Sequence, residues 1–297
     1  MITVLHLINR NRKLYFKDKG MFFTSLITPL ILIVLYGTFL AKIYRDSFAA
    51  ALPAGFEIED ALLNGCVGSQ LCSALLAVSC ITVAFCVNLT MVQDKVTGAK
   101  KDFMISPVKP YQLALGYYIA TVLNTMLVNL LALGICLIYI ANMGWYLTAG
   151  DVALLVLDIF LLVLFGTGLS SVICFPLSTQ GQLSAVGTIV SAGYGFICGA
   201  YMPISNFGEG LQKVLSYFPG TYGTSMLKNH AMRGVFEEMS RVGFPDEVVD
   251  GIRTSLDCNP GFRGEVVSTG QMTAVMVVTV LVLMVLYVLM NRFSKKK

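Results

Sequence analysis

Two long stretches of this sequence carry no charged side chain. Residues 61–93 and 111–150 contain no Asp, Glu, Lys or Arg. The whole chain is 56% hydrophobic and only 13% charged, whereas soluble domains carry about 25% charged residues. So many apolar side chains cannot be hidden in one water-soluble core, and about 20 apolar residues suffice to cross a bilayer. The 297 residues are therefore predicted to form a single polytopic membrane domain.

Six membrane-spanning helices are predicted, which makes the fold class all-α. Helices are expected because an apolar run in lipid must satisfy its own backbone hydrogen bonds. A cleaved signal peptide is the alternative for the first segment, although that run is longer than the usual apolar region of a signal sequence. The segments are residues 21–41, 66–92, 111–143, 152–175, 183–201 and 270–290.

The distribution of Lys and Arg predicts the orientation. With six spans, the N-terminal arm, the stretch 94–110 and the C-terminal tail share one side, and short loops rich in Lys and Arg face the cytoplasm. We therefore expect both termini in the cytoplasm and the chain in the plasma membrane. The basic residues are Arg10, Arg12, Lys13, Lys17, Lys19, Lys95, Lys100, Lys101, Lys109, Arg292, Lys295, Lys296 and Lys297.

Residues 1–19 have the pattern of an amphipathic helix. Such a helix can lie in the headgroup plane with its basic face toward anionic lipid. A simple cluster of charges that fixes topology is the alternative interpretation. The expected apolar face holds Met1, Val4, Leu5, Ile8, Tyr15 and Phe16, and the polar face Asn9, Arg10, Lys13 and Lys17.

Small side chains recur at every fourth position in two of the predicted spans. Four residues are close to one helical turn, so each set forms a stripe. Small stripes let helices approach closely in lipid, either within one bundle or at a subunit interface that lines a substrate path. The stripes are Gly65, Ser69, Ser73 and Ala77 in the second span, and Gly187, Ser191, Gly195 and Gly199 in the fifth.

Asp158 is the one acidic residue inside a predicted span. Intramembrane acids are candidates for proton relays or ion sites. Contact with the outer interface or a hydrogen bond to a neighbouring helix is the structural alternative. His6 and His230 are the only histidines, and His230 is expected to be solvated in a polar external loop.

The sequence lacks the motifs of catalysis and of metal or nucleotide binding. It has neither a P-loop pattern nor H-E-x-x-H nor C-x-x-C, so no catalytic, cofactor or metal residues are predicted. Most of the eight cysteines fall within spans, and only Cys66 and Cys258 are candidates for a disulfide. Basic residues at membrane ends favour lipid over nucleic acid as partner.

The largest polar segment follows the fifth span, at residues 202–268. Residues 211–218 are apolar but too short to cross a bilayer, so a re-entrant or interfacial segment is expected. Pro219–Gly220 should end it. Residues 228–257 alternate apolar and charged side chains, which predicts two short external helices.

The stretch 94–110, DKVTGAKKDFMISPVKP, places charges between two apolar runs. Together with the basic arm before the first span and GAYMPISNFGEGLQKVLSYFPGTY after the fifth, it resembles the permease subunit of an ATP-binding-cassette (ABC) exporter. The type-2 export-permease family, in its drug and antimicrobial-resistance branch, is the most similar. The resemblance covers essentially the whole chain.

The resemblance implies an interfacial N-terminal helix and a re-entrant hairpin before the last span. It also implies a coupling helix at residues 94–105 that docks on a separate ATPase, which would bind ATP and Mg²⁺. A second permease, as a homodimer or a heterodimer, would pair with this one, with spans two and five lining the path. The coupling residues would be Asp94, Lys95, Gly98, Lys100, Lys101 and Asp102.

The predicted function is outward movement of a hydrophobic or amphiphilic substrate such as a drug, a peptide or a lipid-like molecule. Two alternatives stay open: export of a polysaccharide by the same machinery, and a proton-coupled carrier that uses Asp158 without ATP. For the stretch 94–110, a solvated loop that only fixes topology is the alternative to a coupling helix.

Overall fold

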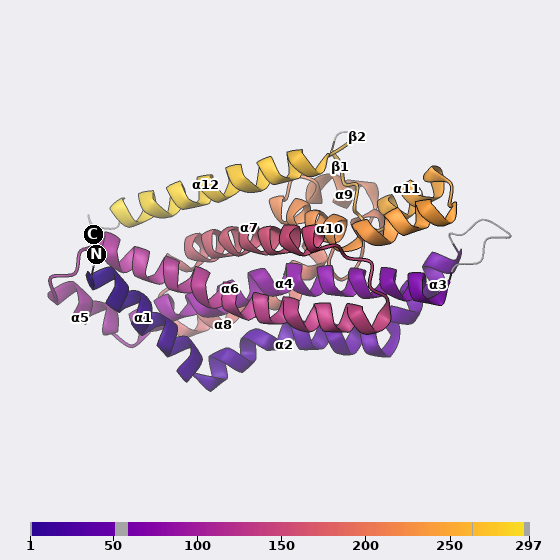
Figure 1. The fold of residues 1–297 in the computed structure, drawn as a ribbon. Coiled ribbons are helices and arrows are strands. Elements are labelled where there is room, and N and C mark those ends of the chain that lie inside the picture. Colours follow the sequence, from indigo (N-terminus) through magenta and orange to yellow (C-terminus); the bar gives the residue numbers. More distant parts are fainter. Residues whose placement is uncertain (1, 51–58, 263, 294–297) are drawn as a thin grey trace.

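The computed structural model describes residues 2–50, 59–262 and 264–293. It is an all-α structure, 84% helical, in which long helices run side by side along an elongated bundle (Figure 1). Both termini and the short helix α5 (Ala99–Ile105) lie at one end, here named the α5 end. Helices α3 (Ala41–Ala50) and α11 (Asp246–Ser255) lie at the other, here named the α11 end.

The remaining elements are α1 (Ile2–Lys17), α2 (Lys19–Leu35), the π-helical turn η1 (Tyr36–Leu40), α4 (Asp60–Val96), α6 (Pro110–Met143), α7 (Ala149–Cys174), α8 (Gln180–Ile197), the 3₁₀ turn η2 (Ile204–Asn206), α9 (Glu209–Leu215), α10 (Pro219–Val242) and α12 (Thr269–Phe293). A small antiparallel hairpin pairs β1 (Gly261–Phe262) with β2 (Glu265–Val266).

Four of these helices are long and apolar enough to cross a membrane. They are α4, α6, α7 and α12, and a fifth span results if α1 and α2, which meet at a bend of 72°, count as one. The chain is therefore a multi-pass membrane protein. Helix α8 has 18 residues, but Gln180 and Gln182 at its N-terminal end make it less apolar than the four helices above. That α8 crosses the membrane therefore stays a prediction.

Helix α4 forms the centre of the bundle. In its most apolar window 94% of the residues are buried, against 28% in α6 and 22% in α12. A helix that is apolar on every side belongs inside a bundle, and α4 packs against α2, α6, α7, α8 and α10. Helices α6 and α12 instead leave much of their apolar surface free for lipid.

Helix α1 packs with a face that coincides only in part with the predicted apolar face. Tyr15, which belongs to that face, is buried together with Leu7 and Asn11, whereas Leu5 is 60% exposed. The reason is close contact with α6, where a Cβ on Gly116 would lie 2.7 Å from the Leu7 Cβ. Asp18 ends α1 and caps α2 by accepting the Met21 backbone N–H at 3.0 Å. That α1 lies at the membrane surface stays a prediction.

The segment after α8 differs from the predicted external loop. Pro219 does not simply break a helix: it occupies the first turn of α10, where proline is well tolerated. This helix has 24 residues and packs against α4, α7 and α12. The first of the two predicted external helices is therefore part of the bundle, and α11 is the second.

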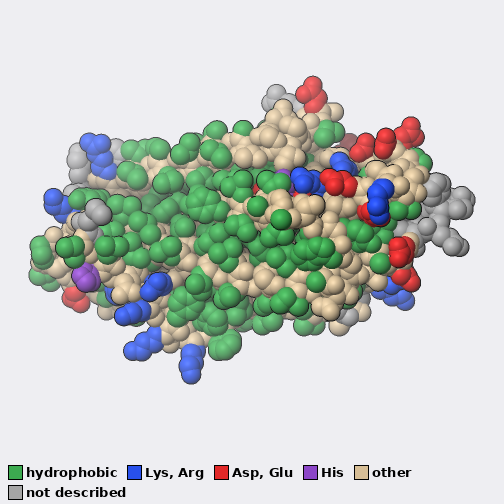
Figure 2. Space-filling view, viewed as in Figure 1, with side chains coloured by type: hydrophobic (Ala, Val, Ile, Leu, Met, Phe, Trp, Pro, Cys, Tyr) green, Lys and Arg blue, Asp and Glu red, His purple; other side chains and the backbone are tan. Residues whose placement is uncertain are grey.

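Charged side chains gather at the two ends of the bundle. Figure 2 shows hydrophobic side chains along the body, Lys and Arg mostly near the α5 end, and most of the visible Asp and Glu toward the α11 end. Among the predicted basic residues, Lys295, Lys296 and Lys297 lie outside the described residues. The polarity of the molecule agrees with the separation of charge that the sequence predicts.

Candidate functional site

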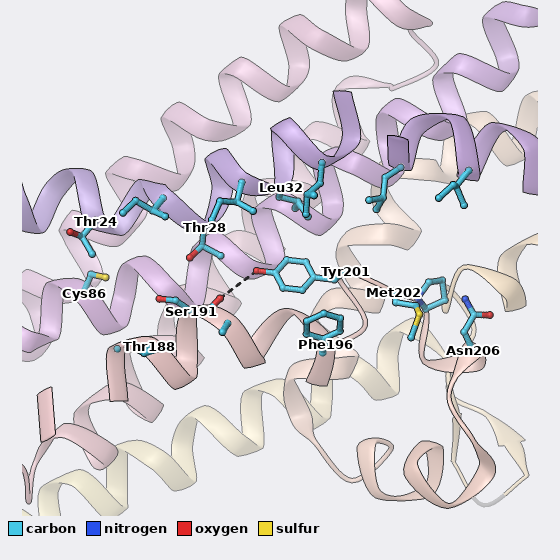
Figure 3. A pocket seen from close by; sticks show the side chains of 18 of the residues that line it. Thr24, Thr28, Leu32, Cys86, Thr188, Ser191, Phe196, Tyr201, Met202 and Asn206 are labelled. Carbon is cyan, nitrogen blue, oxygen red and sulfur yellow. Dashed lines mark hydrogen bonds between the residues drawn. The ribbon is translucent and has the colours of Figure 1, made fainter. Parts of the chain in front are cut away.

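A long groove runs between α2 and α8 (Figure 3). Its volume is about 1110 Å³, and its walls are mainly aliphatic. Side chains from α4 and from the segments after α8 and α11 complete it. The lining residues include Thr24, Ile27, Thr28, Ile31, Leu32, Leu35, Tyr44, Cys86, Leu89, Leu183, Gly187, Thr188, Ser191, Phe196, Tyr201, Met202, Asn206 and Leu256.

The small residues of the predicted stripe in α8 have two different roles. Gly187 and Ser191 line the groove, and no described atom lies within 4 Å of the position that a Gly187 Cβ would take. Gly195 instead receives the Tyr201 ring, which would lie 2.4 Å from its Cβ. Gly199, beyond the end of α8, has a φ of +73°, a conformation that glycine adopts readily.

The stripe of α4 does not line the groove. Ser69, Ser73 and Ala77 are buried within the chain, and Gly65 lies against the Tyr146 ring and the Gly144 carbonyl. In this chain all four residues pack within one bundle, because α4 is enclosed by other helices, and their placement on a path stays a prediction. The contribution of α4 to the groove comes from Cys86 and Leu89.

At the α5 end, the charged stretch folds as a helix end, a turn and a short helix. Helix α4 continues to Val96, and Gly98 has a φ of +85° as the residue that precedes α5. Asp94 and Lys95 therefore belong to the last turn of α4, and of the expected element at residues 94–105 only Ala99–Ile105 forms the short helix α5. A coupling role for these residues stays a prediction. The side chains of Lys101 and Asp102 are exposed on α5.

Asp94 joins three elements of the chain. Its carboxylate accepts two hydrogen bonds from the Arg10 guanidinium of α1, at 2.5 and 2.8 Å, and one from the Tyr117 hydroxyl of α6 at 2.5 Å. Such bidentate pairs fix geometry as well as adding energy. Arg10 also lies 5.0 Å from the centre of the Phe103 ring on α5. We name these four residues the Asp94 cluster.

Lys95 ties the end of α4 to the turn between α7 and α8. Its ammonium group donates to the carbonyl oxygens of Phe175 and, at 2.9 Å, of Leu177. A cation is favourable there because carbonyls at the C-terminal end of a helix lack partners within the helix. The two turns at the α5 end are thereby held together.

One apolar side chain of α5 is largely exposed. Ile105, the last residue of α5, is 87% exposed. Its position beside Lys101 and Asp102 on a short helix makes a mixed apolar and charged surface. Sequence reasoning missed Ile105, although the apolar run Phe103–Ile105 just before Ser106–Pro107 was a usable signal.

Asp158 and Asp151 of α7 are paired with side chains of α10. Asp158 contacts His230 Nδ1 at 2.5 Å, and Asp151 contacts Arg233 Nε at 2.7 Å. The side chain of His230 is only 13% exposed, which corrects the prediction that it is solvated. The neighbouring helix, not the outer interface, supplies the partner of Asp158.

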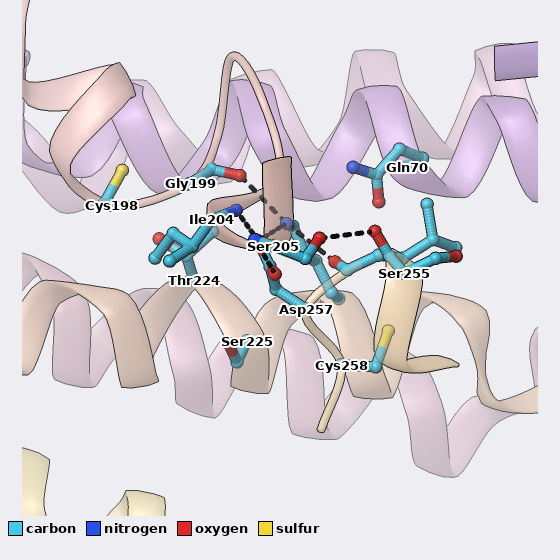
Figure 4. Close-up of polar contacts among 12 residues, drawn as sticks. Gln70, Cys198, Gly199, Ile204, Ser205, Thr224, Ser225, Ser255, Asp257 and Cys258 are labelled. Atoms are coloured by element: carbon cyan, nitrogen blue, oxygen red, sulfur yellow. Dashed lines mark hydrogen bonds and ion pairs between the residues drawn. The ribbon is translucent and has the colours of Figure 1, made fainter. Parts of the chain in front are cut away.

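A buried lysine organises the loops toward the α11 end (Figure 4). Lys228 of α10 donates to the carbonyls of Gly199 and Leu256, each at 2.9 Å, and lies 3.6 Å from Asp257. Asp257 accepts the backbone N–H groups of Ile204 and Ser205 at 2.5 and 3.2 Å. The loop after α8, which borders the groove, is thus fastened to the loop after α11.

The cysteines and the acidic residues form neither a disulfide nor a metal site among the described residues. Cys66 and Cys258 are both buried and free, as are the other six cysteines, all of which lie in the described part of the chain. Among the described residues, no group of three or more His, Cys, Asp or Glu is placed to hold a metal ion.

The helical bundle, the groove and the charged end define a membrane transport component of the permease type. Residues 64–290 match the model of the ABC-2 family transporter proteins, and the chain therefore belongs to that family. Comparison with curated proteins gives no match. Members of this family act in the membrane, normally with an ABC ATPase, and are not catalytic themselves.

Proposed function

We propose that this chain is the permease subunit of an ABC exporter. It moves a hydrophobic or amphiphilic substrate outward, driven by ATP hydrolysis on a separate ATPase that binds ATP and Mg²⁺. The observation that carries the proposal is the apolar groove of about 1110 Å³. The same chain exposes the short helix α5 at its basic end. Placement in the drug and antimicrobial-resistance branch is part of the same proposal.

The lining of the groove supports an apolar substrate. Its polar groups are mostly Ser and Thr hydroxyls such as Thr28, Thr188 and Ser191, set among Ile, Leu and Phe side chains. Binding sites of this kind use apolar walls for affinity and few polar groups for orientation. A polysaccharide would bury many hydroxyls against these walls without partners, which is unfavourable.

A second copy of the chain is proposed to face the groove. Ile27, Ile31 and Phe196, all of which line it, are about half exposed. The same walls of two copies would enclose a path related by two-fold symmetry. On this proposal α2 and α8, not the enclosed stripe of α4, supply most of the path.

Docking of the ATPase is assigned to α5. Lys100, Lys101, Asp102 and Ile105 form the surface, Gly98 permits the turn before it, and Asp94 and Lys95 hold it in place. An apolar anchor surrounded by charges suits a specific, reversible interface. The basic residues near this end support its placement in the cytoplasm, together with both termini.

The test is purification of the tagged chain from native membranes in mild detergent, followed by mass spectrometry. A soluble protein with a P-loop should copurify and should be lost from the Lys100→Glu/Lys101→Glu variant. Lys213→Glu, on exposed α9 toward the other end, is the matched control and should retain it. Absence of any ATPase, under conditions that keep other such complexes intact, would contradict the proposal.

The second candidate is a proton-coupled carrier, favoured by the contact of Asp158 with His230 at 2.5 Å. Asp158→Asn separates the two candidates. Loss of transport that depends on a pH gradient and needs no ATPase supports the carrier. Retention of ATP-dependent transport supports the exporter and gives Asp158 a packing role.

A further inference from the structure

A second groove, of about 440 Å³, lies between α6 and α12 near the α5 end of the bundle. Its walls are apolar and aromatic, and two polar residues stand at the C-terminal end of α12. The lining residues are Pro110, Tyr111, Ala114, Leu115, Tyr118, Met284, Tyr287, Val288, Asn291 and Arg292. We name it the α6–α12 groove.

Aromatic packing gives the α6–α12 groove a fixed shape. The Tyr118 and Tyr287 rings stack with centroids 6.0 Å apart, and the Tyr287 hydroxyl donates to the Ala114 carbonyl at 3.4 Å. The rim, in contrast, is open to the surroundings, because Leu115 is 43% and Val288 63% exposed. Since α6 and α12 are membrane-spanning by length and composition, that rim faces lipid.

The groove also has polar groups that can bind a ligand. Among the described residues that line it, Arg292 is the one charged side chain. Tyr118 is only 8% exposed, and its hydroxyl has no hydrogen-bond partner among the described residues. Arg292 is exposed at the end of the groove, and Lys109 directly precedes Pro110. Neither residues 110–143 nor residues 269–293 contain an Asp or Glu, so these two helices contribute no acid to offset the positive charge.

We propose that the α6–α12 groove binds one anionic phospholipid. Its acyl chain lies between the helices along Leu115 and Val288, and its phosphate meets the Arg292 guanidinium. Basic pockets between membrane helices are a recognised setting for anionic headgroups, and arginine pairs well with phosphate. This inference concerns a lipid bound to the permease and does not rest on the proposed transport activity.

The experiment is native mass spectrometry of the full chain in mild detergent, with phosphatidylglycerol or phosphatidylcholine titrated in. Wild type should bind its first phosphatidylglycerol more tightly than phosphatidylcholine. Arg292→Gln should weaken that step about fivefold, the effect of one basic side chain near a lipid surface, and Arg292→Lys should retain most of it. Lys19→Gln removes a basic residue elsewhere and should change nothing.

A second pair of variants tests the apolar part of the groove. Leu115→Trp fills it and should lower the affinity for both lipids, whereas Leu123→Trp, equally exposed on α6 but outside the groove, should leave it unchanged. The proposal is overturned if wild type binds the two lipids equally, if Arg292→Gln behaves as wild type, or if both tryptophan variants act alike. Cross-linking of two copies through a cysteine at Leu115 would assign the groove to a protein contact instead.

Discussion

At the scale of single residues, several charged side chains of this chain are occupied by contacts within it. Asp94 contacts Arg10 and Tyr117, and Lys95 binds carbonyl oxygens at the end of α7. Charges buried near a membrane are costly unless they are paired and hydrogen-bonded. The charges of the stretch 94–110 are therefore of two kinds, those that hold the turn and those that remain available outside it.

Charge reversal across the Asp94 cluster should show that Arg10 and Asp94 stabilise each other. Asp94→Asn removes charge from the hydrogen bonds to Arg10, so the free energy of unfolding should fall by about 2 kcal/mol. Thermal unfolding in detergent and proteolysis of α1 measure the effect. Arg10→Asp and Asp94→Arg should each destabilise, and the double variant should recover part of the loss. A double variant no better than the sum of the singles would contradict a direct pair.

Replacement of Gly98 should lower the stability of the protein because of its backbone conformation alone. Its φ is +85°, and no described atom lies within 4 Å of its missing Cβ. Gly98→Ala should therefore cost about 1–2 kcal/mol through backbone strain. Gly181→Ala in α8, where the space is equally open and the backbone helical, is the control and should be neutral or stabilising. Equal unfolding temperatures for the two variants would show that an alanine at residue 98 causes no backbone strain.

At the scale of elements, α5 has few contacts of its own and depends on its neighbours for position. It spans seven residues, too short to be stable alone in water. The Asp94 cluster, which includes the Phe103 ring of α5, fixes the base of this helix, and Ile105 projects from its last turn. Contacts with α1, α4 and α6 at its base suit the coupling role that we propose for α5.

Ile105 should be the apolar anchor for the ATPase. Ile105→Asp places a charge in that interface and should weaken the complex by about 2 kcal/mol, or roughly thirtyfold in Kd. Copurification and direct binding of the ATPase measure the loss. Val242→Asp, an exposed residue at the end of α10, is the control. If both variants retain the ATPase equally, α5 does not present Ile105 to it.

At the scale of the whole molecule, charge-free runs were enough to predict most long helices. The expected span 111–143 agrees with α6 (Pro110–Met143), and 270–290 falls within α12. Helix α10 was predicted as a short external helix because Lys228, His230 and Arg233 make it look solvated. Their partners, the Gly199 carbonyl, Asp158 and Asp151, are far away in sequence, so a single sequence does not show that these charges are satisfied.

The groove between α2 and α8 should be blocked without loss of fold. Gly187→Leu projects into it at a site where no described atom lies within 4 Å, and leucine favours the helix by roughly 0.8 kcal/mol over glycine. Transport should therefore fall while the unfolding temperature holds or rises. Gly193→Leu, on the same helix in equally open space but outside the groove, should keep transport. Equal activity of the two variants would place the path elsewhere.

The central position of α4 also has a consequence for how the protein is made. Helices α6, α7, α8 and α10, which enclose α4 in the finished bundle, all follow it in the chain. During synthesis α4 must therefore enter the bilayer before most of its final neighbours exist. The mean hydropathy of 2.2 in its most apolar 18 residues favours that early insertion, and its small side chains then leave room for the later helices. We therefore expect α4 to be inserted early and enclosed as the helices that follow it arrive.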